Sequence, residues 1–263
     1  MSFLSHIDPL YALSGLLVGG LVGMTGVGGG ALMTPILILL FGINPATAVG
    51  TDLIYASITK TGGTFVHGYH RTIDWRVVGL LAMGSVPATA LTILTLYILR
   101  INSGTTQAII TNVLGFALFF TAISLFFRKT LTRYYVHWVG ELDPRIERNL
   151  TIATGAMLGV LVSLSSVGAG AIGATALILL YPKMPAQRIV GSDIAHAVPL
   201  TLVAGLGHSM LGSINWHILV SLLAGSIPAI IVSSIMAARS SDTAVRVALA
   251  CVLILVCIKF WFF

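Results

Sequence analysis

The chain contains the same apolar unit twice. Residues 26–30 (Gly-Val-Gly-Gly-Gly) return as residues 166–170 (Ser-Val-Gly-Ala-Gly), an offset of 140 that becomes 141 after one inserted residue. Residues 50–52 (Gly-Thr-Asp) then match residues 191–193 (Gly-Ser-Asp). A duplicated apolar unit with glycines at matching positions is typical of membrane transporters that bind their substrate between the two copies. Further matched pairs are His67 with His208, Trp75 with Trp216, and residues 84–87 (Gly-Ser-Val-Pro) with 225–228 (Gly-Ser-Ile-Pro).

The composition places the chain in a membrane. Hydrophobic residues make up 57% of the 263 positions and charged residues only 8%, whereas a soluble domain carries about 25% charged residues. We therefore expect an all-α, multi-pass protein of the cytoplasmic membrane. The first residues lack the charged region and cleavage site of a signal peptide, so we expect them to remain in the mature chain.

Each copy contains five apolar runs, of which the first two are shorter than the roughly 20 residues that a membrane-spanning helix needs. These two runs meet at the glycine cluster, where helix propensity is low. We predict two half-length helices in each copy, joined by a non-helical break that is buried in protein or faces a water-filled cavity. The alternative is a plain helical hairpin packed through its glycines. The ten runs are residues 9–24, 27–41, 47–66, 76–99, 105–127, 149–165, 167–181, 187–207, 216–237 and 243–262.

The distribution of positive charge supports five segments per copy. An odd number inserts the second copy upside down, and all Lys and Arg residues except Arg100, Lys259 and the intramembrane Lys60 then fall on one side. The positive-inside rule makes that side cytoplasmic, whereas an eight-span arrangement scatters these residues over both sides. The sequence thus predicts two inverted-topology repeats, at residues 1–127 and 149–263, with a cytoplasmic linker at 128–148.

The chain resembles the TauE/SafE sulfite exporter family, also called the toluenesulfonate uptake permease (TSUP) group. The residues that carry the resemblance are the glycine-rich break followed by Pro35, the Pro-Ala-x-Ala-x-Gly-Thr motif at 45–51, and the repetition of this block. The second copy departs from the pattern, because Ala169 and Thr175 stand in place of Gly29 and Pro35. The resemblance spans nearly the whole chain and implies a transporter that exports sulfite, an organosulfonate or another sulfur-containing anion.

A desolvated anion requires hydrogen-bond donors inside the membrane. The N-terminus of a half-length helix offers free N–H groups and a partial positive charge, and glycine lets an anion approach the backbone closely. We therefore predict that the substrate binds at the two breaks, with neighbouring hydroxyl groups as further donors. The alternative is that these small residues serve helix packing alone. The predicted substrate-binding residues are Thr25, Gly28, Gly29, Gly30, Ser165, Ser166, Gly168 and Gly170.

The third segment of each copy carries ionisable residues at matching positions. Asp52 with Tyr55, and Asp193 with His196, are spaced i to i+3 and share a helix face. Ionisable groups in a membrane usually line a pathway or a proton relay. One hypothesis is that these four residues couple protons to anion movement or gate the pathway. The alternative is that the aspartates cap or tie neighbouring helix ends.

Lys60 is the one cation well inside a predicted span, about 12 Å along the helix from Asp52 at 1.5 Å per residue. It belongs to the predicted coupling and gating set, where it could attract the anion or pair with a carboxylate. It could also extend to the cytoplasmic interface, as long lysine side chains do. The interfacial interpretation is favoured because the matching residue, Thr201, is neutral.

The histidines at the ends of the third segments suggest anchoring rather than metal binding. His67 and His208 each precede a matched tryptophan, which favours a position at the membrane interface. His67 and His70 form a His-x-x-His pair without an accompanying carboxylate or cysteine set. Cys251 and Cys257 fall on opposite sides of a helix and predict neither a disulfide nor a metal pair. We expect no metal and no cofactor.

Other functional classes fit less well. The sequence contains no Walker motif, so the chain does not hydrolyse ATP. An intramembrane aspartyl protease needs a Gly-x-Gly-Asp context, whereas Asp52 and Asp193 follow Gly-Thr and Gly-Ser, and we expect no enzymatic activity. An anion channel and a transporter of another organic anion or carboxylate remain as alternatives. The expected partners are a small anion, lipid and a coupling proton, with no nucleic acid.

Overall fold

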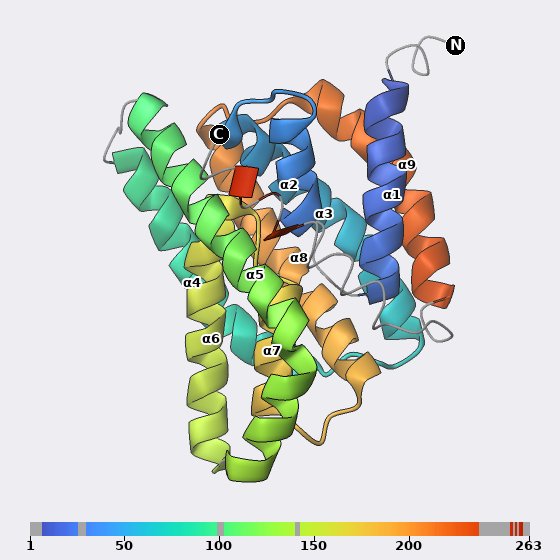
Figure 1. Cartoon of the computed structure of the whole chain (residues 1–263), viewed down its shortest axis with the longest axis vertical. Coiled ribbons are helices and arrows are strands. Elements are labelled where there is room, and N and C mark those ends of the chain that lie inside the picture. Colours follow the sequence, from blue (N-terminus) through green and yellow to red (C-terminus); the bar gives the residue numbers. More distant parts are fainter. Residues whose placement is uncertain are drawn as a thin grey trace.

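The computed structural model describes residues 7–25, 30–98, 103–139 and 143–236, with a few positions between 253 and 259. Within these residues the chain forms helices and no strands (Figure 1), which confirms the predicted all-α class. Most of the run at 243–262, with both cysteines, lies outside the described residues. The helices are α1 (Pro9–Thr25), α2 (Gly30–Leu39), α3 (Pro45–Tyr69), α4 (Trp75–Ile98), α5 (Ser103–Val139), α6 (Pro144–Ser165), α7 (Ala171–Leu180), α8 (Ala186–Met210) and α9 (Trp216–Met236).

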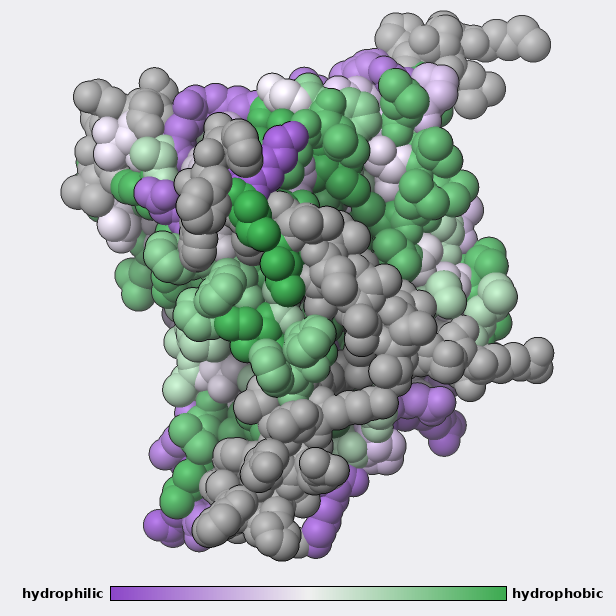
Figure 2. All heavy atoms as spheres, in the orientation of Figure 1, coloured by the Kyte–Doolittle hydropathy of each residue, from purple (hydrophilic) through white to green (hydrophobic). Residues whose placement is uncertain are grey.

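Several of these helices have the length and surface of membrane spans. In the described part of the chain, α4, α6, α8, α9 and the Gln107–Phe127 part of α5 are long and apolar enough to cross a bilayer. Phe116, Phe120 and Phe126 of α5 each expose more than half of their surface, which suits contact with lipid. Hydrophilic residues gather towards the upper and lower ends of the face in Figure 2, with hydrophobic ones over much of the described surface between them. The chain is a multi-pass membrane protein.

Two helices are half as long as a span. Helices α2 and α7 have ten residues each, about 15 Å against a hydrocarbon core of about 30 Å. This agrees with the prediction of a short second segment in each copy. The prediction of a short first segment was wrong for α6, which has 22 residues. It begins at Pro144 because the Asp143 side chain caps it, accepting a hydrogen bond from the Arg145 N–H at 2.8 Å.

The polar stretch predicted as a linker is largely helical. Helix α5 has 37 residues and continues through residues 128–139, while residues 144–148 form the start of α6. The two helices run side by side in Figure 1 and contact each other. The connection between the copies is therefore a pair of extended helix ends, and its cytoplasmic location remains a prediction.

The first helix of the chain packs mainly against the last one that the structure describes. Gly15 of α1 lies against the backbone carbonyl of Leu222, and Gly225 of α9 lies against the backbone carbonyl of Ala12. A Cβ atom at either glycine would collide with backbone. Glycine is thus required on both sides, because it alone lets the two helix backbones approach so closely.

Helices α4 and α6 repeat this contact with the copies exchanged. Gly155 of α6 lies against the carbonyl of Leu81, and Gly84 of α4 lies against the carbonyl of Ile152. These four residues are the sequence equivalents of the four in the α1–α9 contact. Each pair joins the first helix of one copy to the fourth helix of the other, which is the reciprocity expected of two patches related by a two-fold axis.

Helices α3 and α8 pack against each other between these two pairs, with α3 also contacting α9 and α8 also contacting α4 (Figure 1). They are the third helices of the two copies. Polar side chains that would be costly in lipid are buried along both of them. These buried polar residues are Thr51, Asp52, Ser57, Thr59, Lys60 and His67 of α3, and Ser192, Asp193, His196, Thr201 and His208 of α8.

Candidate substrate site

The break in the second copy is a non-helical turn, as predicted. Helix α6 ends at Ser165, and Ser166 follows in the left-handed conformation with φ 58°. Gly168 and Gly170 have φ angles of 119° and 135°, which only glycine adopts without strain. Helix α7 then begins at Ala171, and its N-cap residue, Gly170, has no side chain that could cap it. The Gly173 N–H donates to the Gly168 carbonyl at 3.1 Å, so the N–H groups of α7 that could serve an anion are those of Ala171 and Ile172.

The break in the first copy lies in a part of the chain that the structure does not describe. Helix α1 ends at Thr25 and α2 begins at Gly30, so Gly28 and Gly29 fall outside the described residues, as does the side chain of Thr25. A role for these residues in substrate binding remains a prediction from the sequence.

The two serines of the second break have different surroundings. Ser165 Oγ donates to the Leu161 carbonyl at 2.7 Å and accepts from the Val167 N–H at 3.1 Å, so this hydroxyl is used within the turn. Ser166 is 5% exposed, and its Oγ has no hydrogen-bond partner among the described residues. A buried hydroxyl without a partner is unfavourable. Ser166 is thus the better candidate for a substrate donor.

Lys60 reaches from the first copy into this break. Its side chain is 2% exposed, and Nζ donates a hydrogen bond to the carbonyl oxygen of Ala169 at 3.2 Å. The prediction that Lys60 extends to the membrane interface was wrong, because its side chain turns into the protein. The matching residue, Thr201, donates instead to the Ala197 carbonyl of its own helix. Lys60 is thus the one buried Lys or Arg among the described residues, and the second copy has no charged counterpart to it.

The two predicted aspartates lie at the half-length helices. Asp52 is fully buried, and its Oδ2 accepts a hydrogen bond from Thr34 Oγ1 of α2 at 2.6 Å. Asp193 is also fully buried, with its carboxylate against Gly173 in the first turn of α7, where a Cβ atom would displace it. Each carboxylate thus joins a third helix to the half-length helix of its own copy, which favours the interpretation that they tie helix ends.

The charged groups of the site act on one another. Lys60 interacts electrostatically with both Asp52 and Asp193, and the Ser166 hydroxyl lies near the Asp52 carboxyl. Charges buried in a low-dielectric interior interact strongly. The structure therefore brings together four predicted residues of the two copies that are far apart in the sequence.

His196 and Tyr55 occupy equivalent places on the two central helices. Both are fully buried. His196 Nε2 and Ser85 Oγ are 2.9 Å apart, and the Tyr55 hydroxyl lies near Ser226, which pairs with Thr59 Oγ1 at 2.9 Å. Neither Ser85 nor Ser226 is among the site residues predicted from the sequence. The signal was present, since both lie in the repeated Gly-Ser-x-Pro motif.

His67 and His208 are buried rather than interfacial. His67 Nδ1 lies 2.9 Å from Thr72 Oγ1, and His208 Nε2 lies 2.9 Å from the Ser163 carbonyl oxygen. The anchoring prediction was wrong for both, because the loops after α3 and α8 fold back over protein. Trp75 and Trp216, at the starts of α4 and α9, are more than half exposed, as interfacial residues would be.

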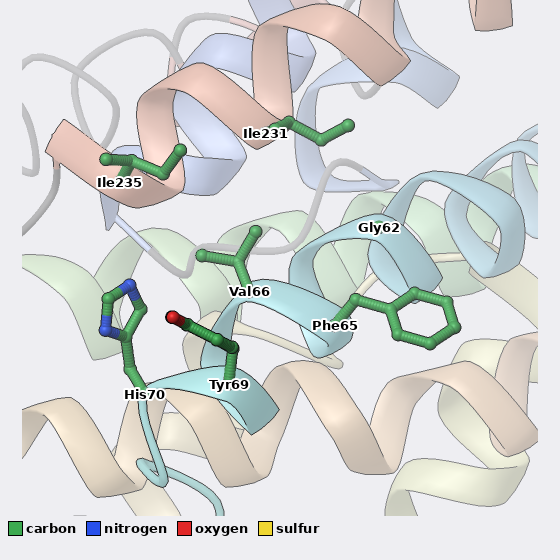
Figure 3. Close-up of a pocket in the computed structure, with 7 residues that line it drawn as sticks. All are labelled: Gly62, Phe65, Val66, Tyr69, His70, Ile231 and Ile235. Carbon is green, nitrogen blue, oxygen red and sulfur yellow. The ribbon is translucent and has the colours of Figure 1, made fainter.

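An apolar cavity of about 470 Å³ lies elsewhere, between the end of α3 and α9 (Figure 3). None of the predicted site residues lines it, and the described residues of its wall include no Lys or Arg that would suit an anion. Its lining residues are Gly62, Phe65, Val66, Tyr69, His70, Ile231 and Ile235.

A helical membrane bundle with a broken helix pair and a buried cluster of ionisable groups at its centre is the architecture of a membrane transporter. The family model described as "Sulfite exporter TauE/SafE" matches residues 11–260. The chain belongs to this family, and the resemblance in the sequence is confirmed.

Similar proteins are named as transporters. The chain is 42% identical over 243 residues to the probable membrane transporter protein YjnA of Bacillus subtilis, which covers 92% of this chain and 95% of that protein. It is 26% identical over 206 residues to the probable membrane transporter protein MJ0441 of Methanocaldococcus jannaschii, which covers 75% of this chain and 70% of that protein. The probable membrane transporter protein YunE of Bacillus subtilis is 22% identical over 232 residues, which cover 81% of this chain and 82% of that protein. No solved structure matches the chain.

Proposed function

We propose that this protein is a secondary transporter that exports a small sulfur-containing anion, sulfite or an organosulfonate, by alternating access. The family supports the transporter class and the description "sulfite exporter" supports the substrate and direction. The observation that carries the proposal is the hydrogen bond from buried Lys60 to Ala169 in the second break. It puts a cation beside the Ser166 hydroxyl and the N-terminus of α7, which are the kinds of donor that an oxyanion needs.

The two copies are inverted relative to each other, with the site between them. Support comes from the reciprocal contacts of α1 with α9 and of α4 with α6, and from the positive residues that an odd number of segments gathers on one side. Alternating access then exposes one central site to the two sides of the membrane in turn.

The charge of the site favours a proton as the coupling ion. Two ionised carboxylates and one ammonium give the cluster of Asp52, Asp193 and Lys60 a net charge of −1, which repels an anion. Uptake of one proton by either carboxylate neutralises the cluster. Anion and proton therefore bind together and move in the same direction, with the concentration gradient of the anion driving export.

The test uses purified protein in liposomes and labelled sulfite or a labelled sulfonate. We expect saturable uptake that accelerates when the liposomes contain unlabelled substrate, because a carrier exchanges substrate across the membrane whereas a channel does not. Lys60→Met should lower the rate at least tenfold, since a hydrogen bond to a charged group contributes about 1.5–3 kcal/mol. Lys60→Arg should keep part of the activity, and Thr201→Val, at the matching position, is the control.

Two results would contradict the proposal. One is flux that neither saturates nor responds to internal substrate. The other is a normal rate in Lys60→Met at a normal membrane content of the protein.

A further inference from the structure

Two loops close over the central helices in the same way. The loop after α3, residues 70–74, packs on the start of α8, where the Asp74 N–H donates to Ser192 Oγ at 2.8 Å and the Thr72 carbonyl lies against Gly191. A Cβ atom at Gly191 would collide with that carbonyl. We call this contact the first latch.

The loop after α8, residues 211–215, makes the equivalent contact with α3. The Asn215 N–H donates to Thr51 Oγ1 at 3.0 Å, and the Ser213 carbonyl lies against Gly50. This second latch consists of the same positions with the copies exchanged. The two latches lie at opposite ends of the α3–α8 pair, because the inverted copies point in opposite directions.

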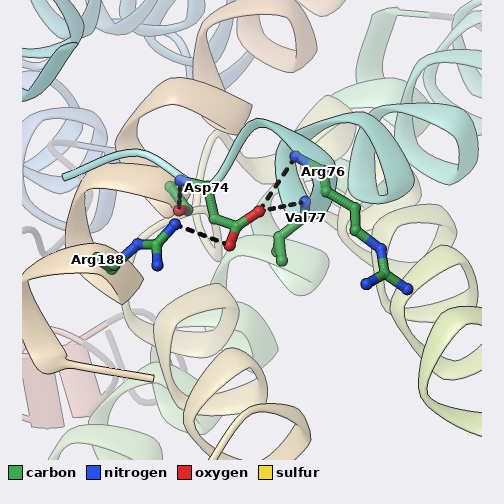
Figure 4. A network of polar contacts seen from close by, with 5 residues as sticks. Asp74, Arg76, Val77 and Arg188 are labelled. Carbon is green, nitrogen blue, oxygen red and sulfur yellow. Dashed lines mark hydrogen bonds and ion pairs between the residues drawn. The ribbon is translucent and has the colours of Figure 1, made fainter. Parts of the chain in front are cut away.

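Among the described residues, an ion pair between the two copies is present in the first latch and absent from the second. Asp74 caps α4, with Oδ1 accepting from the N–H groups of Arg76 and Val77 at 3.2 and 3.4 Å. Its Oδ2 accepts in addition from an Arg188 guanidinium nitrogen at 3.1 Å (Figure 4). The pair joins the first copy to the second across the first latch.

The second latch contains a cap and no ion pair. Asn215 Oδ1 accepts from the N–H groups of His217 and Ile218, both at 3.1 Å. Asparagine carries no charge, and the positions matching Arg188 in the first copy are Thr47 or Ala48, which are also uncharged. The described contacts of the second latch thus involve uncharged groups.

We infer that the Asp74–Arg188 ion pair is a gate lock, which makes the first latch the harder of the two to open. It biases the resting protein towards the conformation that is closed on the side of the positive residues, the cytoplasmic side. The inference rests on the proposed alternating access. Only in such a cycle does weakening one latch favour the conformation in which the other latch is closed.

Two buried residues lie beneath the latches, and their accessibility would indicate whether each latch is open. Ala195 of α8 is 3% exposed and packs with Ile73 and Val78 under the first latch. Its equivalent, Ile54 of α3, is 7% exposed and belongs to a hydrophobic cluster that includes residues of α9, with Ile214 of the second latch packed against that cluster. A cysteine at either position is shielded while the latch is shut.

The experiment measures thiol labelling of Ala195→Cys and Ile54→Cys by a membrane-impermeant maleimide in inverted and right-side-out vesicles. Both natural cysteines are replaced by alanine in the background. The test variants are Asp74→Asn, which keeps a side chain able to cap α4, and Arg188→Gln. The control is Asn215→Asp, which adds a carboxylate to the second latch without a cation.

We expect both test variants to speed labelling at position 195 about two- to five-fold, the range for a partly exposed ion pair, with labelling at position 54 unchanged or slower. Asn215→Asp should not speed labelling at 195. Unchanged labelling at 195 overturns the inference, and so does a parallel increase at both positions, which would report general loosening of the fold. The assay contains no substrate, so a wrong substrate assignment leaves its result intact.

Discussion

The Nζ atom of Lys60 lies 3.2 Å from the carbonyl oxygen of Ala169, so that a cation of the first copy holds the broken segment of the second. A carbonyl offsets only part of the cost of burying an ammonium group, and Asp193 and Asp52 offset a further part electrostatically. Cation, carboxylates and break therefore form one unit. Substitutions in any of them should alter the same step of transport.

Replacing Ser166 should weaken substrate binding without weakening the fold. Ser166→Gly removes the unpartnered hydroxyl and relieves the left-handed backbone at φ 58°. We expect the KM for the anion to rise about tenfold, the effect of one hydrogen bond to a charged group, with an unchanged melting temperature. Ser165→Ala should lower the melting temperature and leave the KM unchanged, because the Ser165 hydroxyl forms hydrogen bonds within the turn. Equal KM values for wild type and Ser166→Gly would remove Ser166 from the site.

Adding one methyl group at Gly173 should strongly lower the rate of transport. The new Cβ atom would occupy the place of the Asp193 carboxylate, which must then leave the first turn of α7. We expect Gly173→Ala to lower the transport rate at least tenfold, because losing a buried contact of a charged group costs about 1.5–3 kcal/mol. Gly79→Ala is the matched control, because its Cβ atom meets open space. Similar transport rates in the two variants would show that the position of Asp193 is unimportant.

The pH dependence of transport should depend on the two aspartates. At high pH both carboxylates are ionised and the cluster repels the anion, so the rate should fall as pH rises. A sulfonate is the substrate of choice, because it stays ionised and does not itself contribute to the profile. Asp52→Asn and Asp193→Asn each remove one titrating charge and should flatten the decline. Profiles parallel to that of the wild type would exclude proton coupling through these residues.

Stability should depend on the glycines that join the two copies. Gly84→Ala and Gly225→Ala force a Cβ atom against a helix backbone that cannot yield, and overpacking of this kind costs about 1–3 kcal/mol. We expect a lower melting temperature in detergent for both variants, with similar decreases because the contacts are equivalent. Gly20→Ala of α1, whose Cβ atom meets nothing within 4 Å, should be neutral or stabilising. A decrease in Gly20→Ala as large as the others would refute this account.

Much of the site could be predicted from local patterns. The glycines of residues 166–170 predicted the second break, since positive φ angles are favourable for glycine alone. The i to i+3 spacing of Asp193 and His196 predicted a shared buried face, which both residues occupy. These features depend on the conformation of a few neighbouring residues, which the sequence encodes directly.

Contacts between distant segments could not be predicted in this way. Lys60 and Ala169 are 109 positions apart, and neither residue alone indicates that they meet. His67 and His208 were predicted at the interface from their places at the ends of apolar runs. They are buried because the following loops return over the opposite copy, a feature of tertiary structure.

The exchange of glycine contacts between copies has a consequence for how this transporter moves. The first helix of each copy packs against the fourth helix of the other copy, so neither copy forms a complete bundle on its own. A rocking motion that separated residues 1–127 from residues 149–263 would break both of these helix–helix contacts. We therefore expect the rigid bodies of the proposed transport cycle to be hybrids, α1 with α9 and α4 with α6, each built from one helix of either copy.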